Sequence, residues 1–137
     1  MMISTKGRYA LRVMIDLAGQ QPGAYIPLKD IAARQNISEK YLESIVVQLS
    51  KANFLDGVRG KGGGYRLSRA PESYTVASIL TLLEGSLAPI ACLEDPNTPC
   101  PRAAECPTYP MWRDFYAMTT KYFGGITLAD LTKEKDV

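Results

Sequence analysis

Apolar residues recur every three or four positions through three consecutive stretches of the first fifty residues. Such spacing places them on one face of a helix, so the pattern predicts three helices. These cover residues 4–20, 27–36 and 38–49. Ser4 and Ser38 are candidate N-caps, because a short side chain with an oxygen can accept the unpaired N–H groups of a first turn. Pro27 suits the first position of the short middle helix, and Asn36 its left-handed end.

A short helix, a turn of about three residues and a longer helix together form a helix-turn-helix, whose second helix presents its first residues to base edges. Here the exposed residues at that position are Ser38, Glu39, Lys40, Tyr41, Glu43 and Ser44. From the helices alone, a three-helix bundle that binds no nucleic acid is the favoured alternative. The next segment separates the two interpretations.

Two stretches that alternate apolar and polar side chains follow the helices, over residues 54–59 and 65–68. The glycine-rich segment between them predicts a β-hairpin. A helix-turn-helix followed by such a hairpin is a winged helix, so the predicted fold is mainly α with one small hairpin. Cations on the hairpin can neutralise phosphates, while glycines let the backbone approach DNA closely. The candidate contacts on this wing are Arg59, Gly60, Lys61, Gly62 and Gly63.

The glycine-rich loop does not fit a nucleotide-binding fingerprint. A phosphate-binding loop needs Gly-Lys followed by Ser or Thr, whereas Gly62 follows Lys61. A dinucleotide fingerprint that starts at Gly60 needs a third glycine at the position of Tyr65. A flexible hairpin tip without a ligand stays open as the other interpretation.

Composition narrows the chemistry further. The 137 residues contain no histidine, which excludes Ser–His and Cys–His nucleophilic sites and histidine acid–base catalysis. Residues 1–70 hold 11 Lys or Arg against 5 Asp or Glu, whereas residues 71–137 hold 5 Lys or Arg against 9 Asp or Glu. The first half is therefore the part expected to bind an anionic partner. No apolar run is long enough to span a bilayer and no secretory signal is visible. We therefore expect a cytoplasmic protein that is not an enzyme and contacts no membrane.

Beyond a fourth helix, predicted from the N-cap Thr75 to Gly85, the helical pattern disappears. Six of the nine prolines and all three cysteines lie in the segment that follows. Thiolates could hold a metal or an iron–sulfur cluster there, which would order a segment with no apolar core of its own. The cysteines are Cys92, Cys100 and Cys106.

The spacing of the cysteines matches neither the CxxC pairs of zinc ribbons nor the common ferredoxin runs. Three ordinary thiols and a thiol switch stay open as alternatives. So does a small iron–sulfur electron carrier, in which the basic wing would have no role. A cluster also needs a further ligand, from another subunit, from an exogenous molecule or from a nearby oxygen donor. Those donors are Glu94, Asp95, Glu105 and Tyr109.

The last long helix is predicted over residues 110–123 and is apolar on more than one face. A surface helix needs one apolar stripe, so the additional area suggests packing against a second copy of the chain. A helix buried within its own domain is the alternative. The residues assigned to dimerisation are Met111, Trp112, Phe115, Tyr116, Met118 and Tyr122. Thr127 and Asp130 then form a capping box for a short final helix.

The chain thus divides into a winged helix-turn-helix region (1–85), a Cys- and Pro-rich segment (86–108) and a dimerisation helix with a short final helix (109–137). Over nearly its whole length it resembles the IscR-type winged-helix regulators of the Rrf superfamily. The resemblance rests on the three loop cysteines and on segments 4–10, 37–43, 58–65, 112–114 and 126–128. Its specific parts are the wing and the sequence Trp112-Arg113-Asp114.

This resemblance implies a homodimer that crosses through the C-terminal helix and sets two winged-helix heads on a pseudo-palindromic DNA site. It implies regulation of genes for iron–sulfur assembly or cysteine supply, and we expect a repressor, with an activator as the alternative. It also implies a 2Fe-2S cluster on Cys92, Cys100 and Cys106. The alternative is a cluster-free regulator of the same family that responds to a metabolite, to thiol oxidation or to a partner enzyme.

Three departures from the family pattern bear on the cluster, and the first is a longer gap between the first two cysteines, Cys92 and Cys100. IscR-like proteins place a ligand histidine three residues beyond the third cysteine, where this chain has Tyr109. Related sensors take an acidic ligand from the first helix of the partner, and the matching position here is Arg8. The fourth ligand is therefore left open by the sequence.

Overall fold

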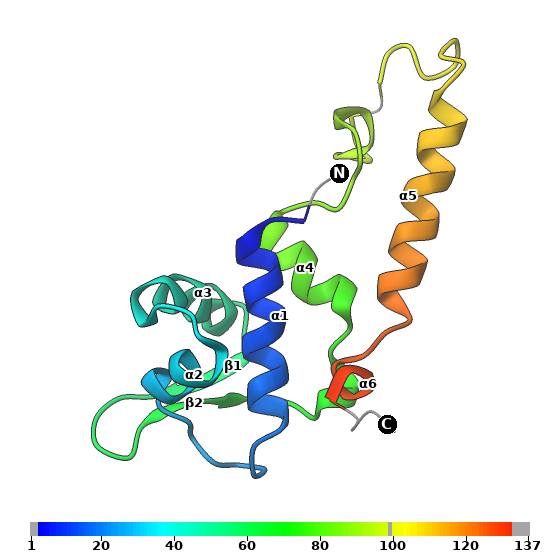
Figure 1. Ribbon diagram of the computed structural model, residues 1–137. Coiled ribbons are helices and arrows are strands. Elements are labelled where there is room, and N and C mark those ends of the chain that lie inside the picture. The colour runs from blue at the N-terminus through cyan, green and yellow to red at the C-terminus, as the bar shows by residue number, and fades with distance from the viewer. Residues whose placement is uncertain (1–2, 99, 133–137) are drawn as a thin grey trace.

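The computed structural model describes residues 3–98 and 100–132, and the fold is mainly helical with one antiparallel hairpin, as predicted (Figure 1). In chain order the elements are α1 (Thr5–Ala18), α2 (Leu28–Gln35), α3 (Glu39–Lys51), β1 (Leu55–Val58), β2 (Gly64–Leu67), η1 (Pro71–Ser73), α4 (Val76–Glu84), η2 (Ala91–Leu93), α5 (Tyr109–Gly124) and α6 (Leu128–Thr132).

The helices begin where the sequence places their caps. The side-chain oxygens of Ser4, Ser38 and Thr75 each accept a first-turn backbone N–H, at N···O distances of 3.1, 3.1 and 3.0 Å. Asn36 ends α2 in the left-handed conformation, with φ of 55°. Pro27 is the N-cap of α2 rather than its first helical residue, so that helix begins one position later than predicted. These local hydrogen bonds satisfy donors that a helix end otherwise leaves unpaired.

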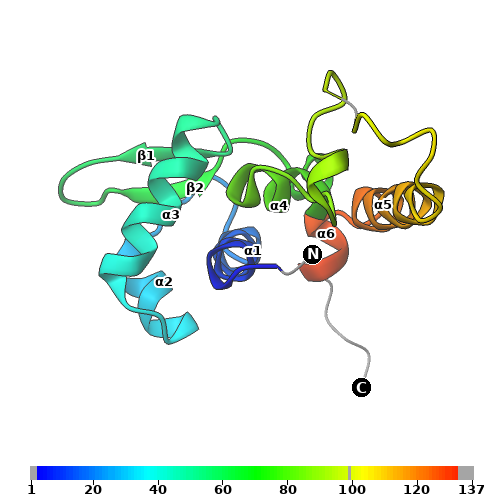
Figure 2. The same ribbon diagram turned by 90° about the horizontal axis from the view of Figure 1, so that it is seen from above.

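The main core forms where α1, α2 and α3 meet the hairpin and α4 (Figure 2). Ala10, Val13 and Met14 of α1 are completely buried. The completely buried side chains of α3 are Leu42, Ile45, Val46 and Leu49. Burying a valine- to leucine-sized side chain contributes about 1.5–3 kcal/mol relative to leaving it exposed. One face of α3 therefore holds it against the body, and the opposite face is left to solvent.

The wing pairs Leu55 with Leu67 at its base and Val58 with Gly64 near its tip. Strand β1 is one residue shorter at each end than the predicted stretch 54–59, and β2 has the length of the predicted stretch 65–68 but begins one residue earlier. An isolated bridge between Ile26 and Tyr65 adds the connection before α2 to the same sheet edge. The wing is thus hydrogen-bonded to the helix-turn-helix as well as covalently joined to it.

Helix α5 stands beside the body and contacts it through a second, smaller cluster (Figures 1 and 2). Val76, Leu80 and Leu87 are buried in this cluster, and Tyr116 and Phe123 of α5 pack against them. Tyr116, which the sequence assigned to dimerisation, therefore contacts its own chain. The neighbouring apolar stripe of α5 is exposed.

The final helix returns to the main core. Leu128 is completely buried there, and its backbone N–H donates to the carbonyl oxygen of Tyr74 at 2.9 Å. The predicted capping box is present, because Thr127 N–H donates to the Asp130 carboxylate while the Asp130 N–H donates to Thr127 Oγ1. Among the described helices, none combines the length and the hydrophobicity that crossing a bilayer requires.

Candidate nucleic-acid interface and cysteine segment

The start of α3 is open to solvent at every position that the sequence nominates for base contacts. These residues are Ser38, Glu39, Lys40, Tyr41, Glu43 and Ser44. These side chains differ in whether they make contacts with neighbouring residues. The Ser44 hydroxyl donates to the Tyr41 carbonyl at 2.9 Å, and the ring of Tyr41 meets that of Tyr9 edge-on with centroids 5.6 Å apart. Ser38, Tyr41 and Ser44 are therefore tied to the local structure.

The wing tip is a tight turn in which the Gly63 N–H donates to the Gly60 carbonyl oxygen at 3.0 Å. Gly60 and Gly62 have φ of 94° and 78°, a region that L side chains rarely adopt. The exposed residues of the tip are Arg59, Gly60, Lys61 and Gly62. Gly63 differs from the other nominated wing residues because it is buried, and a Cβ there would clash with the Val58 carbonyl oxygen. Gly63 thus shapes the turn.

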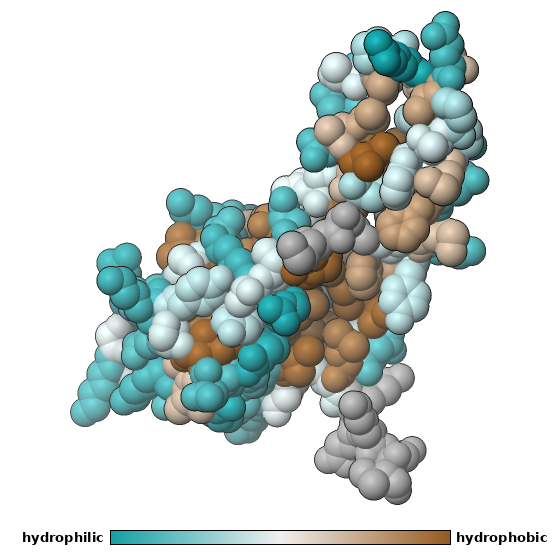
Figure 3. All heavy atoms as spheres, turned by 45° about the horizontal axis from the view of Figure 1, so that its top comes forward, coloured by the Kyte–Doolittle hydropathy of each residue, from teal (hydrophilic) through white to brown (hydrophobic). Residues whose placement is uncertain are grey.

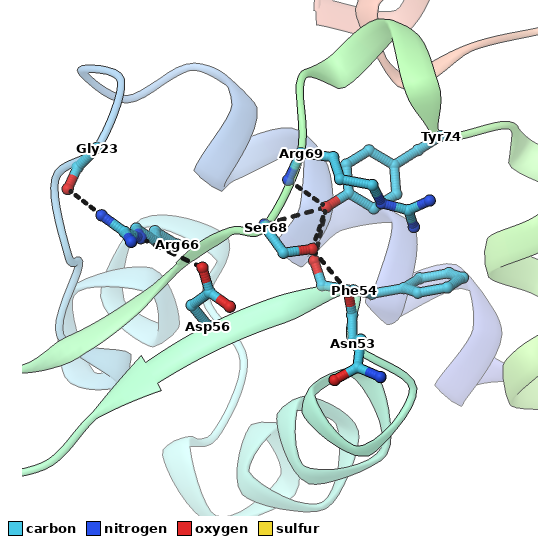
Figure 4. Close-up of polar contacts among 8 residues, drawn as sticks. All are labelled: Gly23, Asn53, Phe54, Asp56, Arg66, Ser68, Arg69 and Tyr74. Carbon is cyan, nitrogen blue, oxygen red and sulfur yellow. Dashed lines mark hydrogen bonds and ion pairs between the residues drawn. The ribbon is translucent and has the colours of Figure 1, made fainter.

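Tyr74 fastens the base of the wing to the body (Figure 4). Its hydroxyl donates to the Phe54 carbonyl oxygen at 2.7 Å and accepts the backbone N–H groups of Ser68 and Arg69, each at 3.1 Å. The Arg69 guanidinium carbon lies 4.5 Å from the centroid of the Tyr74 ring, a cation–π contact. Both ends of the hairpin therefore converge on one buried side chain.

Arg66 gives the wing a second attachment. Its Nε lies 3.4 Å from Asp56 Oδ2 on the facing strand, and its Nη1 donates to the Gly23 carbonyl oxygen at 3.3 Å (Figure 4). Its guanidinium carbon is also 4.5 Å from the centroid of the Tyr25 ring. Arg66 is occupied by intramolecular contacts, so Arg59 and Lys61 are the wing cations best placed to meet a phosphate.

A buried carboxylate fixes α2 against α1. Asp16 is 8 % exposed and accepts two hydrogen bonds from Arg34, at 3.0 and 2.8 Å, and one from Gln35 Nε2 at 2.9 Å. The hydrogen bond to Asp16 raises the pKa of the Arg34 guanidinium, which stays charged. The first helix of the helix-turn-helix therefore has a set orientation relative to α1.

A hollow of about 500 Å³ separates the second half of α3 from the wing. Val47, Ser50 and Lys51 line it from α3, and Val58 and Arg59 from the wing. Val47 and Lys51 are not among the base contacts predicted from the sequence. A signal was present, because these residues lie one and two turns beyond Glu43 and Ser44 on the same exposed face of the helix.

The cysteine segment leaves the body after α4 and leads to the far end of α5 (Figure 1). All three thiols are partly exposed. The side chain of Cys100 raises the pKa of Cys92. Cys106 Sγ lies 3.3 Å from Thr108 Oγ1, and this hydrogen bond lowers the pKa of Cys106.

Thiolates are suitable ligands for an iron–sulfur cluster. Within residues 3–98 and 100–132, however, no group of three or more Cys, Asp or Glu side chains converges on a possible metal position. As described, the three thiols therefore do not form a cluster site.

A helix-turn-helix whose second helix is exposed beside a glycine-tipped hairpin defines the class of winged-helix transcription regulators. Residues 3–134 match the Rrf2 family, described as an iron-dependent transcriptional regulator. The chain belongs to the Rrf2 family.

The curated relatives are named transcriptional regulators and not enzymes, which confirms the prediction that this chain is not an enzyme. The HTH-type transcriptional regulator IscR of Vibrio atlanticus is 34 % identical over 137 residues, covering 100 % of this chain and 78 % of that protein. The IscR of Aliivibrio salmonicida is also 34 % identical, with 100 % and 80 % covered.

Solved structures of CymR and of IscR proteins are similar to this chain. CymR of B. subtilis, titled the global cysteine regulator, has a TM-score of 0.80 and 36 % identity, with 99 % of each chain covered. The oxidized form of Staphylococcus aureus CymR has a TM-score of 0.76 and 33 % identity, with 100 % of each chain covered. The IscR of T. potens has a TM-score of 0.76 and 35 % identity, covering 96 % of this chain and 85 % of that one.

Proposed function

We propose that this protein binds a specific duplex DNA sequence as a homodimer and represses transcription from that site in the cytoplasm. The observation that carries the proposal is the exposure of the start of α3 and of the wing tip at the same end of the molecule (Figure 1). With α3 in the major groove, Lys40 and Glu43 reach base edges. Arg59 and Lys61 then meet phosphates beside the adjoining groove.

The second copy would pair through α5. Met111, Phe115, Met118 and Tyr122 are exposed and recur every three or four residues, so they form one stripe along this helix. Hydrophobic residues gather between the body and α5, whereas the wing-bearing end is mainly hydrophilic (Figure 3). A two-fold contact between α5 helices would cover the stripe and present two recognition helices to a pseudo-palindromic site.

The proposed target genes serve cysteine supply, with iron–sulfur assembly as the second possibility. The match to the global cysteine regulator of B. subtilis covers 99 % of both chains. This likeness to a cysteine regulator supports the first possibility, and the description of the family as iron-dependent supports the second.

The cysteine segment is proposed to transmit the signal to DNA. Leu87, at the start of the segment, is buried against the same cluster that holds Tyr116 and Phe123 of α5. A rearrangement of residues 86–108 would therefore shift α5 and change the spacing of the two recognition helices relative to their half-sites.

The DNA-binding proposal is tested with duplexes selected from a random library and fluorescence anisotropy over a range of salt concentrations. Arg59→Ala and Lys61→Ala should each weaken binding on every sequence and reduce the slope of log K against log salt, by about 0.9 per lost phosphate contact. Lys121→Ala, on α5 away from the wing, is the matched control and should leave the slope unchanged. A protein that ignores every duplex at low ionic strength would refute the proposal.

Base reading has a separate test in the same assay. Glu43→Ala should change which bases the protein prefers at one position of each half-site and leave the salt slope unchanged, because Glu43 carries no positive charge to release counterions. An equal loss of affinity on all sequences would contradict a base contact by Glu43.

A second candidate concerns the signal itself. A 2Fe-2S cluster on the three thiols is supported by the description of the family as iron-dependent and by the identity to IscR proteins, and it requires the segment to bring Cys92, Cys100 and Cys106 together. Anaerobically purified protein would then contain iron and sulfide and absorb visible light, and Cys100→Ala would not. A colourless, iron-free protein that still regulates transcription would instead support the cluster-free alternative.

A further inference from the structure

Val47 lies in the middle of the exposed face of α3, and 46 % of its surface is accessible. Successive residues of an α-helix are about 100° apart, so residues 40, 43, 44, 47 and 51 form a single stripe. The side chains buried on the opposite face are Leu42, Ile45, Val46 and Leu49. Val47 is therefore an apolar side chain among the candidate base contacts and takes no part in the core.

A single exposed apolar side chain is ordinary on a protein surface, so the surroundings of Val47 matter more than its exposure. Val58 on the wing is 48 % exposed, and both valines line the hollow between α3 and the wing. Lys51 and Arg59 line the same hollow. Two cations beside two apolar side chains suit a sugar–phosphate strand together with the apolar part of an adjoining base.

The geometry of duplex DNA decides which groups reach this hollow. When a recognition helix occupies the major groove and a wing contacts the adjoining minor groove, the strand that separates the two grooves passes between helix and wing. The 5-methyl of thymine is the apolar group that a base pair presents in the major groove. We propose that Val47 contacts the 5-methyl group of one thymine in each half-site. This inference rests on the proposed DNA binding and deepens it by naming a specificity-determining residue.

The expected effect follows from the burial of a methyl group. Removing one buried methyl should weaken binding about fourfold per half-site, and about fifteenfold when both half-sites are changed. This loss of affinity should disappear in a variant with a shorter side chain at position 47. The thymine 5-methyl then has too little apolar surface to contact.

The experiment replaces each thymine of the selected duplexes in turn by deoxyuridine, which removes the 5-methyl and keeps the Watson–Crick hydrogen bonds. Affinities are measured for the wild type, Val47→Ala and Val58→Ala. One thymine position should weaken wild-type binding about fifteenfold when changed in both half-sites, and Val47→Ala binding less than twofold. Val58→Ala, a valine of similar exposure on the other wall of the hollow, should keep the full sensitivity to deoxyuridine.

Three outcomes would overturn the inference and leave DNA binding intact. They are selected half-sites without a constant thymine, wild-type binding that ignores every deoxyuridine, and a Val47→Ala variant as sensitive as the wild type. Failure to select any duplex would overturn the proposed function instead. Thermal melts should be the same for the wild type and both variants, because neither valine belongs to the described core.

Discussion

The hydroxyl of Tyr74 lies at the base of the wing, where its removal can be studied without a change of shape. Tyr74→Phe should lower the free energy of unfolding by about 1–3 kcal/mol, since the Phe54 carbonyl and two backbone N–H groups lose a buried partner. Urea denaturation measures the change. Tyr109→Phe, at the start of α5, is the control and should stay within about 0.5 kcal/mol of the wild type, because no hydrogen bond among the described residues reaches its hydroxyl. Equal midpoints for the two variants would contradict the role of Tyr74.

The buried carboxylate of Asp16 should also contribute to the stability of the fold. Asp16→Asn keeps the shape but leaves Arg34 beside a neutral amide, so the free energy of unfolding should fall by about 1–3 kcal/mol. The control is Asp114→Asn, because Asp114 lies 3.5 Å from Arg113 in a pair whose side chains are 72 % and 60 % exposed. An exposed pair of this kind contributes about 0–1 kcal/mol. Thermal unfolding of both variants compares the two carboxylates, and similar losses would show that the burial of Asp16 is irrelevant.

At the scale of the element, the wing depends on close approach between backbones. Gly64 has φ of 148°, and a Cβ at this position would clash with the Ile26 carbonyl oxygen. Gly64→Ala should therefore open the bridge in which Ile26 and Tyr65 exchange hydrogen bonds of 2.8 and 2.9 Å. Hydrogen exchange of these two amides should become faster, while the protection of α3 is retained. Gly124→Ala, where a Cβ has open space, should leave exchange in the wing unchanged, and slow exchange at both amides of Gly64→Ala would contradict the clash.

Element boundaries could be predicted from the sequence because their causes are local. The hydrogen bond that caps α3 joins Ser38 to Tyr41, three residues away, and the left-handed Asn36 needs no distant partner. The wing was likewise predictable from alternation around a glycine-rich turn. The exposed start of α3 followed from the same reasoning, since one buried stripe on a helix implies an open one.

Contacts between distant segments left no such signal. Tyr74 is one aromatic residue among many until the hairpin ends are brought to its hydroxyl by the fold. Gly63 was assigned to the open tip, yet the turn folds back on Val58 and buries it. The two apolar stripes of α5 were visible in sequence, whereas the assignment of Tyr116 to its own chain depends on where α4 lies.

At the scale of the whole molecule, the division of α5 into two faces explains how one helix could serve both the fold and a dimer. Tyr116 and Phe123 hold α5 to the second cluster of its own chain. Met118 and Tyr122, at 70 % and 67 % exposure, lie outside both described clusters. A substitution on the exposed stripe can therefore change assembly and leave the folded chain intact.

Met118→Glu should make the protein monomeric at concentrations where the wild type is a dimer, because a carboxylate loses its hydration in an apolar interface. Sedimentation equilibrium measures the assembly state, and binding to a duplex with two half-sites should fall about 100-fold or more as the second head is lost. Thr120→Glu adds the same charge at an exposed position on the other side of α5, so it should stay dimeric and keep its affinity. If Met118→Glu behaved like Thr120→Glu, the dimer would have to use another surface. A wild type that sediments as a monomer even when bound to the full site would exclude the homodimer altogether.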